Sequence, residues 1–329
     1  MKPIKIYFAA AWAGGGQGER FLVEEGIRNK LCSYVYPSQF TGWVEAIKEV
    51  PEHFSGSIII DSGAFSAWNK GEEIDLQKYI EYGHWTIAQA KEIGEPLRVV
   101  NLDVIPGKKG MTASLTKGFT NKENKAIINQ AAKQGYKNLL TMLKAGIIPI
   151  HVFHQGEDFI WLERMAEKTD YIGISPANDM PTRSRNNWIA SVFSYLYRNK
   201  IDVKTHGFAV HSREMLLRFP WTSCDAASWR LAAGMGTIYF PVGGFQNPDY
   251  SRKGIVMNIS EKKTRKGTKG MTDYIVKLLE GSGFSYEELQ TWQVRTRLNI
   301  RYFLGLEKWI NEQRAKTEYK PGRKTGQFF

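Results

Sequence analysis

Short runs of apolar, β-branched or aromatic residues recur along the first 230 residues of the chain, and stretches with helical periodicity separate most of them. The runs that read as strands are residues 4–10, 32–36, 57–61, 98–104, 149–154, 171–175, 204–210 and 223–227. Examples of the helical pattern are residues 19–30, 76–93, 121–145, 158–168 and 186–198. Eight strands that alternate with helices predict an α/β fold, a (β/α)8 TIM barrel. A doubly wound open sheet is the alternative, since the sequence does not reveal whether a sheet closes.

The pattern changes after the eighth run. Residues 237–242 read as one more strand, a basic stretch follows, and residues 272–279 and 286–313 read as helices. A capping box, Ser285-x-x-Glu288, begins the longer helix, and Leu298, Tyr302 and Leu306 lie on one face of it. We therefore divide the chain into a barrel over residues 1–249 and a basic, mainly helical extension over residues 250–329 that packs on the barrel.

The composition is that of an ordinary globular protein, with 42% hydrophobic and 24% charged residues in a chain of 329. The first apolar run is too short for a signal peptide or a membrane span, so we read it as a strand and expect a soluble protein without a membrane partner. Cys32 and Cys224 form neither a disulfide framework nor a paired CxxC zinc site. This use of cysteine fits a reducing cytoplasm, that of the host if the protein is viral.

The formal charge of +12 is concentrated near the C-terminus. Residues 1–249 hold 28 basic and 25 acidic side chains, whereas residues 250–329 hold 17 and 8. The basic residues crowd one stretch and the tail: Arg252, Lys253, Lys262, Lys263, Arg265, Lys266 and Lys269, then Arg314, Lys316, Lys320, Arg323 and Lys324. Clustering of one sign favours a surface that binds a polyanion such as nucleic acid. The alternative is a set of solvated loops that keep the protein in solution.

Polar residues stand at the ends of several predicted strands, where a barrel of this type carries its reacting groups. They are Asp61, Asp103, Gln155, Ser175 and Asp225, and His206 lies within the seventh strand. Carboxylates that end apolar strands are costly to desolvate unless they are paired, hydrogen-bonded or engaged with substrate. Three of them in one chain favour an enzyme that uses one carboxylate as nucleophile and another as general acid/base.

Each of these residues also has an ordinary structural explanation. Asp61 before Ser-Gly can form an Asx-turn, and Asp103 can cap a turn. Gln155 and Asp225 can cap the helices that follow them. A barrel glycosidase acting on sugars through Asp61 and Asp225 is a further alternative.

Aromatic and glycine-rich segments near the first strands are less specific. Phe65 and Trp68 follow Asp61 and would give a stacking platform for a heterocyclic base, or else belong to the core. The glycine-rich loop at residues 14–18 lacks the Lys-Ser/Thr of a P-loop and the spacing of a dinucleotide fingerprint. His151 and His154 fall on opposite faces of a strand. We therefore predict no metal site and no cofactor.

In order along the chain, the strand-end residues resemble the active-site signatures of tRNA-guanine transglycosylases. The matching pieces are Asp61-Ser62-Gly63-Ala64-Phe65, Asp103, Gln155-Gly156, Gly173 to Ser175, and Asp225. The resemblance covers roughly residues 55 to 230, and its most specific piece is Asp-Ser-Gly-Ala-Phe. That family has a (β/α)8 barrel and exchanges guanine for a 7-deazaguanine through a covalent enzyme–ribose intermediate.

The resemblance assigns a role to each matching position. It implies that Asp225 is the nucleophile that attacks C1′ and that Asp61 is the general acid/base. Asp103 and Gln155 would read the guanine edge, which suits a carboxylate that accepts from N1–H and N2–H and an amide that donates to O6. The backbone of Gly173 and Ser175 would assist in reading the base. Phe65 and Phe208 would stack on its two faces, and Arg230 would contact a phosphate.

Two departures from the family's pattern bear on the nucleic acid that is used. The tRNA enzymes carry a structural zinc site built from a CxCxxC cluster and a His, which this chain lacks, and Ala64 stands where a second Gly is usual. The chain therefore looks more like the phage and bacterial enzymes that insert 7-deazaguanines such as preQ0 into DNA. Such an enzyme would flip the target guanosine out of the duplex or act on single strands, while the basic extension holds the phosphates.

These observations predict a DNA guanine transglycosylase with DNA and a free 7-deazaguanine base as partners. One alternative is a tRNA-guanine transglycosylase with the same chemistry. Another is a barrel without catalytic activity that binds nucleic acid through its basic surface. The sequence leaves open which deazapurine is inserted, the sequence context, the oligomeric state and the need for a helper protein.

Overall fold

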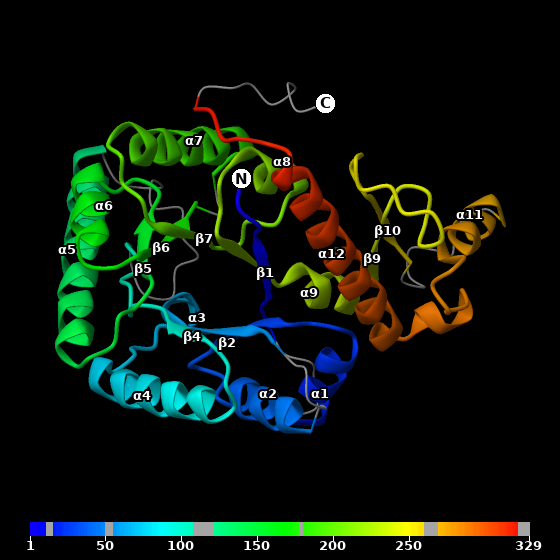
Figure 1. The fold of residues 1–329 in the computed structure, drawn as a ribbon, viewed down its shortest axis with the longest axis horizontal. Coiled ribbons are helices and arrows are strands. Elements are labelled where there is room, and N and C mark those ends of the chain that lie inside the picture. Colours follow the sequence, from blue (N-terminus) through cyan, green and yellow to red (C-terminus); the bar gives the residue numbers. More distant parts are fainter. Residues whose placement is uncertain (11–15, 50–54, 108–120, 178–179, 260–268, 322–329) are drawn as a thin grey trace.

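Eight parallel strands form one sheet in the order β4-β3-β2-β1-β8-β7-β6-β5. This computed structural model describes residues 1–10, 16–49, 55–107, 121–177, 180–259 and 269–321 (Figure 1). The strands are β1 (Lys5–Phe8), β2 (Asn29–Ser33), β3 (Ser57–Asp61), β4 (Leu97–Val99), β5 (His151–His154), β6 (Tyr171–Ser175), β7 (Lys204–Gly207) and β8 (Ser223–Ala226).

The two outermost strands of this order also meet each other. A parallel bridge joins Val100, just after β4, to Ile150, just before β5. The Ile150 N–H donates to the Val99 carbonyl and the Asn101 N–H donates to the Ile150 carbonyl, each at 2.8 Å. The sheet therefore closes on itself, which confirms the (β/α)8 barrel and excludes the open sheet.

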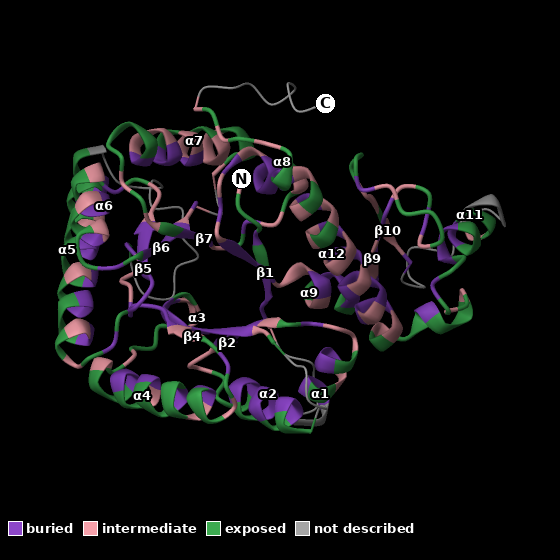
Figure 2. Cartoon of the chain, viewed as in Figure 1, coloured by how far each residue is buried: buried purple, intermediate pink, exposed green. Residues whose placement is uncertain are grey.

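Helices surround the barrel and turn their buried faces toward it, apart from the short helix α3, which Figure 1 shows inside this ring, beside β4 (Figures 1 and 2). They are α1 (Gly16–Glu24), α2 (Ser38–Lys48), α3 (Ala64–Lys70), α4 (Leu76–Glu92), α5 (Asn121–Lys144), α6 (Phe159–Ala166), α7 (Thr182–Arg198) and α8 (Arg213–Arg218). No helix among the described residues is long and apolar enough to cross a membrane.

Alternation along the strands separates two cores. Side chains that point into the barrel form one buried cluster: Tyr7, Ala9, Leu31, Ile59, Val100, Ile150, Val152 and Tyr171. Their neighbours along the strands, such as Ile6, Ile58 and Ile60, belong to the larger cluster between the strands and the helices. The same alternation makes Asp61 and Asp225 inward-facing, because they lie two residues beyond Ile59 and Ser223.

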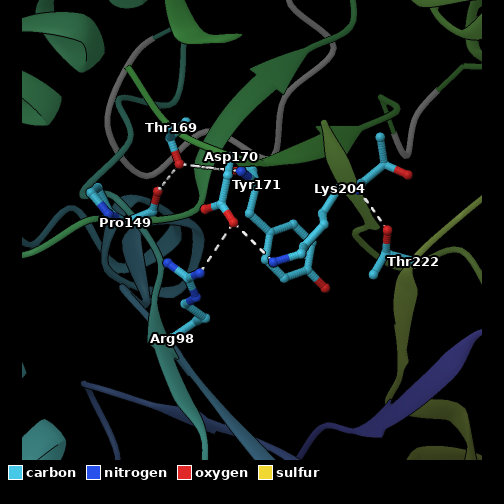
Figure 3. Close-up of polar contacts among 8 residues, drawn as sticks. Arg98, Pro149, Thr169, Asp170, Tyr171, Lys204 and Thr222 are labelled. Atoms are coloured by element: carbon cyan, nitrogen blue, oxygen red, sulfur yellow. Dashed lines mark hydrogen bonds and ion pairs between the residues drawn. The ribbon is translucent and has the colours of Figure 1, made fainter. Parts of the chain in front are cut away.

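The N-terminal ends of the strands carry a polar network of their own (Figure 3). Asp170, before β6, accepts from Arg98 Nη2 of β4 at 3.2 Å and from Lys204 Nζ of β7 at 2.9 Å. All three side chains are at least one-third exposed, so the network adds little to stability. It lies at the opposite end of the barrel from the strand-end carboxylates.

After β8 the chain leaves the barrel and returns to it. It forms α9 (Ser228–Gly234), an antiparallel pair of β9 (Thr237–Phe240) and β10 (Ile255–Asn258), α11 (Lys269–Leu279), the 3-10 helix η1 (Glu287–Gln290) and α12 (Trp292–Ala315). These elements enclose a separate small core that includes Ile238, Phe240, Ile275 and Leu298. The boundary expected between residues 249 and 250 thus lies between the paired strands β9 and β10.

The long helix expected over residues 286–313 is interrupted. Thr291 is extended (φ −83°, ψ 132°), so η1 ends before α12 begins. The capping box forms and belongs to η1: the Ser285 N–H donates to Glu288 Oε2 at 2.7 Å, and the Glu288 N–H donates to Ser285 Oγ at 3.3 Å. Arg295 holds the break, because its Nη1 donates to the carbonyls of Leu289 and Gln290.

Helix α12 then packs between the barrel and the β9–β10 pair (Figure 1). It hydrogen-bonds to the backbone of the first strand region, where the Ile4 N–H donates to Asn311 Oδ1 at 2.7 Å and the Ile6 N–H donates to Glu307 Oε1 at 3.1 Å. Asn311 Nδ2 returns a hydrogen bond to the Ile4 carbonyl at 3.0 Å. The extension therefore supplies partners for backbone groups of the barrel itself.

Two predicted strands are clearly misplaced. The fourth was expected over residues 98–104, but β4 ends at Val99, so Asp103 lies four residues beyond the strand. The other is the second strand. It was expected over residues 32–36, and β2 covers Asn29–Ser33. The strand was predicted to begin too late because Lys30 is charged and so does not look like part of a buried strand. In the fold this lysine is fully buried on the outer face of the strand, 3.5 Å from Glu19 of α1. Helix α1 ends at Glu24, followed by Gly26 at a positive φ of 92°, whereas a helix was expected as far as residue 30. No residue ranges were predicted for helices α2, α3, α8 and α9.

Candidate active site at the barrel mouth

The end of β3 places Asp61 in a tight turn at the mouth of the barrel. Asp61 Oδ2 accepts from the Gly63 N–H at 2.9 Å, so the Asx-turn considered from the sequence does form. Gly63 has a φ of +72°, and a Cβ there would lie 2.7 Å from Val35 Cγ1. The turn requires glycine at this position, and it leads directly into α3.

The Asp61 carboxyl is protonated more easily than an ordinary aspartate. Burial is the main cause that raises its pKa from 3.8 to about 7, and the negative charge of Asp103 adds to it. The Gly63 N–H opposes the shift, and Asp225 contributes a smaller repulsion. The three strand-end carboxylates therefore share one electrostatic environment, as expected for carboxyl ends of parallel strands that meet at one mouth.

Asp103 is held by two side chains. Ser62 donates to its Oδ1 at 3.2 Å, and His154 Nε2 lies 3.0 Å from its Oδ2. Burial, the largest single influence, lowers the pKa of His154, but the hydrogen bond and charge of Asp103 and the charge of Glu157 outweigh it, so the pKa is raised. Asp103 thus pairs with His154 across the mouth.

Glu157 lies beside this pair. Burial raises its pKa to about 7, against the opposing charge of His154 and a hydrogen bond from the backbone. His154 was predicted only as a possible metal ligand, and Glu157 was not among the predicted site residues. The position of His154 at the end of β5, on the inward face with Val152, was the signal that could have found it. No three His, Cys, Asp or Glu side chains in the described part of the chain lie close enough together to hold a metal ion.

Asp225, in β8, faces inward and is 8% exposed. Its Oδ1 accepts from the Ala209 N–H at 2.8 Å, and His206 Nε2 lies 3.4 Å from the same oxygen. The alternative role as a helix cap is wrong, because Ala227 occupies the cap position of α9. The backbone beyond β7 thus fixes this carboxylate from one side.

Gln155 joins β5 to β6. Its N–H donates to the Ser175 carbonyl at 3.0 Å, and its Oε1 accepts from the Ala177 N–H at 3.1 Å. Gln155 does not cap α6, since Asp158 accepts from the Ile160 N–H in that role. The amide oxygen of Gln155 is therefore engaged, which leaves its NH2 group as the part that can address a ligand.

Gly173 and Phe208 pack against each other. A Cβ on Gly173 would lie 2.3 Å from Phe208 Cε2, so the phenyl ring requires glycine at this position. The half-buried Phe208 ring also meets the edge of His206, with ring centroids 4.6 Å apart. Phe208 therefore covers the β6–β7 side of the barrel interior directly above Gly173.

Phe65 and Trp68 were expected either to form a stacking platform or to belong to the core, and each of them fits one of these two explanations. Trp68 is 7% exposed and belongs to the core, whereas Phe65 is 51% exposed on the first turn of α3. The two rings stack with centroids 6.1 Å apart. An exposed aromatic ring supported by a buried one, four residues after Asp61, can stack on a flat ligand at the mouth.

Three of the predicted nucleic-acid contacts lie within the described residues. Arg252 is paired with Asp249 at 2.9 Å, and it and Lys253 are exposed between β9 and β10. Arg230 of α9 stacks over the Trp292 ring at 4.3 Å, and its Nε has no hydrogen-bond partner among the described residues. Lys262, Lys263, Arg265 and Lys266 lie outside the described residues.

Four arginines of α12 do not belong to a basic surface, although they contribute to the charge excess. Arg314 is fully buried and donates to the carbonyls of Lys2, Leu216, Phe219 and Trp221. Arg295 is 8% exposed, and Arg297 and Arg301 both pair with Glu25. The assignment of Arg314 to a basic tail was therefore wrong, because its charge holds the helix to the barrel.

A cavity of about 400 Å³ lies outside the barrel, between α6, α7 and the segment after α12. Its lining includes Tyr195, Arg198, Arg218 and Tyr319 and none of the strand-end carboxylates. The candidate site is thus identified by its chemistry at the strand ends and not by the size of a cavity.

Comparisons with known proteins give weak likenesses of fold. No family model and no curated protein matches the sequence. A mutant tryptophan synthase alpha-subunit from the hyperthermophile Pyrococcus furiosus is 14% identical over 71% of this chain and 91% of that one, with a TM-score of 0.39. A HpcH/HpaI aldolase/citrate lyase family protein from Burkholderia cenocepacia J2315 is also 14% identical, over 71% and 92% of the two chains, with a TM-score of 0.38. Likenesses this distant carry no information on activity.

Proposed function

We propose that this protein is an enzyme, a guanine transglycosylase that replaces guanine in DNA with a 7-deazaguanine. The observation that carries the proposal is the pair of inward-facing carboxyls with different environments. Asp61 has a pKa raised to about 7, so a neutral carboxylic acid is available near neutral pH. Asp225 accepts a backbone N–H through one oxygen and keeps the other for chemistry. Glycosyl transfer through a covalent intermediate requires such an acid and such a nucleophile.

In the first half-reaction, Asp225 Oδ2 attacks C1′ of the flipped nucleotide as its bond to N9 of guanine breaks. The carboxylate stabilises the oxocarbenium-like transition state before it forms the ester. Asp61 gives its proton to the departing guanine. In the second half-reaction, Asp61 takes the N9 proton of the incoming 7-deazaguanine, N9 attacks C1′, and the Asp225 carboxylate leaves.

Base recognition would fall to the β4–β6 side of the mouth. Asp103 can accept from N1–H and the 2-amino group of guanine, since each of its oxygens has a second lone pair beyond its contact with Ser62 or His154. The free NH2 group of Gln155 can donate to O6. A base with the wrong edge would leave these buried groups unpaired, which disfavours it.

Phe65 would stack on one face of the base, because its ring is exposed and backed by Trp68. Phe208 would cover the other face from β7. Arg252, Lys253 and Arg230 would bind phosphates, together with Lys262, Lys263, Arg265 and Lys266. The target guanosine would enter the barrel by flipping out of the duplex or from a single strand.

Incubation of the purified protein with a labelled 7-deazaguanine and either DNA or tRNA tests the proposal. We expect label to enter DNA, and we expect the Asp225→Asn variant to incorporate none and to form no covalent adduct. Label in tRNA alone would replace the DNA assignment by a tRNA-guanine transglycosylase. Binding of nucleic acid without any exchange, unchanged in Asp225→Ala, would leave a barrel that only binds.

A further inference from the structure

We infer that His206 is a positioning residue for Asp225: a buried hydrogen-bond chain from Tyr171 through Ser223 sets the His206 tautomer that aims Nε2–H at Asp225 Oδ1. This inference rests on the proposed function for its catalytic consequence. Its structural part concerns four side chains inside the barrel and can be tested without any substrate.

The chain starts below the mouth, in the barrel interior. The Tyr171 hydroxyl of β6 hydrogen-bonds to Ser223 Oγ of β8, which lies 2.6 Å from Nδ1 of His206 in β7. All three residues are buried, and His206 is 0% exposed. The upper end of the chain is His206 Nε2, which lies 3.4 Å from Asp225 Oδ1 and has no hydrogen-bond partner among the described residues.

The number of hydrogens available sets which atom donates in each link of this hydrogen-bond chain. Burial raises the pKa of Tyr171, so its hydroxyl keeps its hydrogen, and Ser223 Oγ is the acceptor within reach of it. The Ser223 hydroxyl must then donate its own hydrogen, and Nδ1 of His206 is the acceptor within reach. With Nδ1 as acceptor, the imidazole proton is on Nε2. The opposite tautomer would point a lone pair at the Asp225 carboxylate, and the Ser223 hydroxyl, which would then accept from both neighbours, would have no acceptor for its own hydrogen.

Packing holds the ring in place for this purpose. Its edge contacts are with Tyr7, at a centroid distance of 5.9 Å, and with Phe208, at 4.6 Å. These rings approach at 71° and 69°, which leaves the imidazole little freedom to flip. The long 3.4 Å separation is that of a donor placed for Asp225 before substrate binds, since such contacts often tighten in the reacting complex.

The two donors on Oδ1 distinguish the two oxygens of Asp225. The Ala209 N–H and His206 Nε2 both address Oδ1, and Oδ2 has no hydrogen bond or ion pair within the described part of the chain. Oδ2 is therefore the atom free to form the ester, and Oδ1 becomes the ester carbonyl oxygen. Donors to Oδ1 stabilise the free carboxylate more than the ester. His206 thus favours departure of Asp225 in the second half-reaction.

Two variants separate this role from simple packing. His206→Gln places an amide NH2 where Nε2–H stood, whereas His206→Phe fills the volume without a donor. With a guanine-containing oligonucleotide as the probe, we expect His206→Phe to raise the ratio of covalent adduct to free enzyme about tenfold and to lower kcat with little change in the KM for the free base. His206→Gln should restore the wild-type ratio. An unchanged or lower adduct ratio in His206→Phe would overturn the catalytic role.

The tautomer is measured independently by 15N NMR of histidine-labelled protein, which has six histidines. We expect a His206 signal with Nε2 protonated and Nδ1 as acceptor, assigned by its loss in His206→Gln, and a mixture of tautomers in Ser223→Ala. A protonated Nδ1 in the wild-type protein would overturn the hydrogen-bond chain. The absence of adduct and exchange in every variant, together with the expected tautomer, would refute the proposed function and leave the positioning of Asp225 standing.

Discussion

His154 Nε2 lies 3.0 Å from Asp103 Oδ2, and this pair joins the ends of neighbouring strands β4 and β5 at the point where the barrel closes. Both side chains are nearly buried, with exposures of 14% and 11%. Replacing only one residue of such a pair is destabilising, because the charge of the other residue remains buried without a partner.

Asp103→Asn should therefore lower the pKa of His154, since burial, which opposes its charge, would no longer be outweighed by the aspartate. A histidine whose folded pKa is raised stabilises the fold fully below its unfolded pKa, and this contribution is lost as pH rises through the folded value. The variant should thus lose at least about 1 kcal/mol more stability at pH 5.5 than at pH 9. Urea unfolding at both pH values and NMR titration of His154 check this. An equal loss at the two pH values would contradict it.

Asp61→Asn should show a pH dependence in the same direction, because the pKa of Asp61 is also raised in the folded protein. The folded pKa of Asp61 is raised from 3.8 to about 7, so its contribution to stability is present below the unfolded value and is lost as pH rises to the folded one. Asparagine removes that loss and still accepts from the Gly63 N–H. We expect the variant to gain on the order of 4 kcal/mol relative to wild type between pH 4 and pH 8.5. Denaturation that gives the same difference at both ends of this range would show that Asp61 does not titrate there.

Phe65→Ala and Trp68→Ala form a matched pair. Phe65 is 51% exposed, so its removal should leave the free energy of unfolding nearly unchanged and weaken binding of the base about tenfold, the equivalent of one lost stacking contact. Trp68 is 7% exposed, so its removal should cost about 3 kcal/mol of stability. Calorimetry and steady-state kinetics of both variants check this. A large loss of stability in Phe65→Ala would assign that ring to the core.

Arg314 should behave as a structural residue despite its charge. Its guanidinium is fully buried among four backbone carbonyls, so Arg314→Met would leave those acceptors unsatisfied and cost about 3 kcal/mol or more. Lys320→Ala, at an exposed position, should change stability by no more than about 0.5 kcal/mol. Urea unfolding compares the two. Near-neutral behaviour of Arg314→Met would show that α12 is held by other contacts.

The double variant Arg252→Ala/Lys253→Ala should weaken DNA binding at low salt and reduce the slope of log affinity against log salt by about 1 to 2. The same charge change in Lys48→Ala/Lys91→Ala, on α2 and α4 across the barrel, is the control and should leave the slope unchanged (Figure 1). Titrations of a labelled duplex at several salt concentrations measure both. Equal effects of the two double variants would indicate that DNA binds through general charge alone.

Two strands were predicted from the local sequence pattern with the same first and last residues that the structure shows. Residues 57–61 and 171–175 are observed as β3 and β6 with those bounds, because each is a short apolar run whose neighbours break the pattern. The second strand was misplaced because Lys30 is polar in sequence and buried in the fold, where Glu19 lies beside it. The identity of a residue does not reveal a charge partner that comes from another element.

The sequence by itself determined the alternation of strands and helices and the strand-end positions of Asp61, Asp103 and Asp225, since both follow from local periodicity. The tertiary structure decided whether the sheet closes, which depends on the bridge between Val100 and Ile150. It also decided that His154 pairs with Asp103 and that Arg314 is buried rather than part of a basic tail. These are contacts between residues far apart in the chain, and their energies depend on burial that no local pattern records.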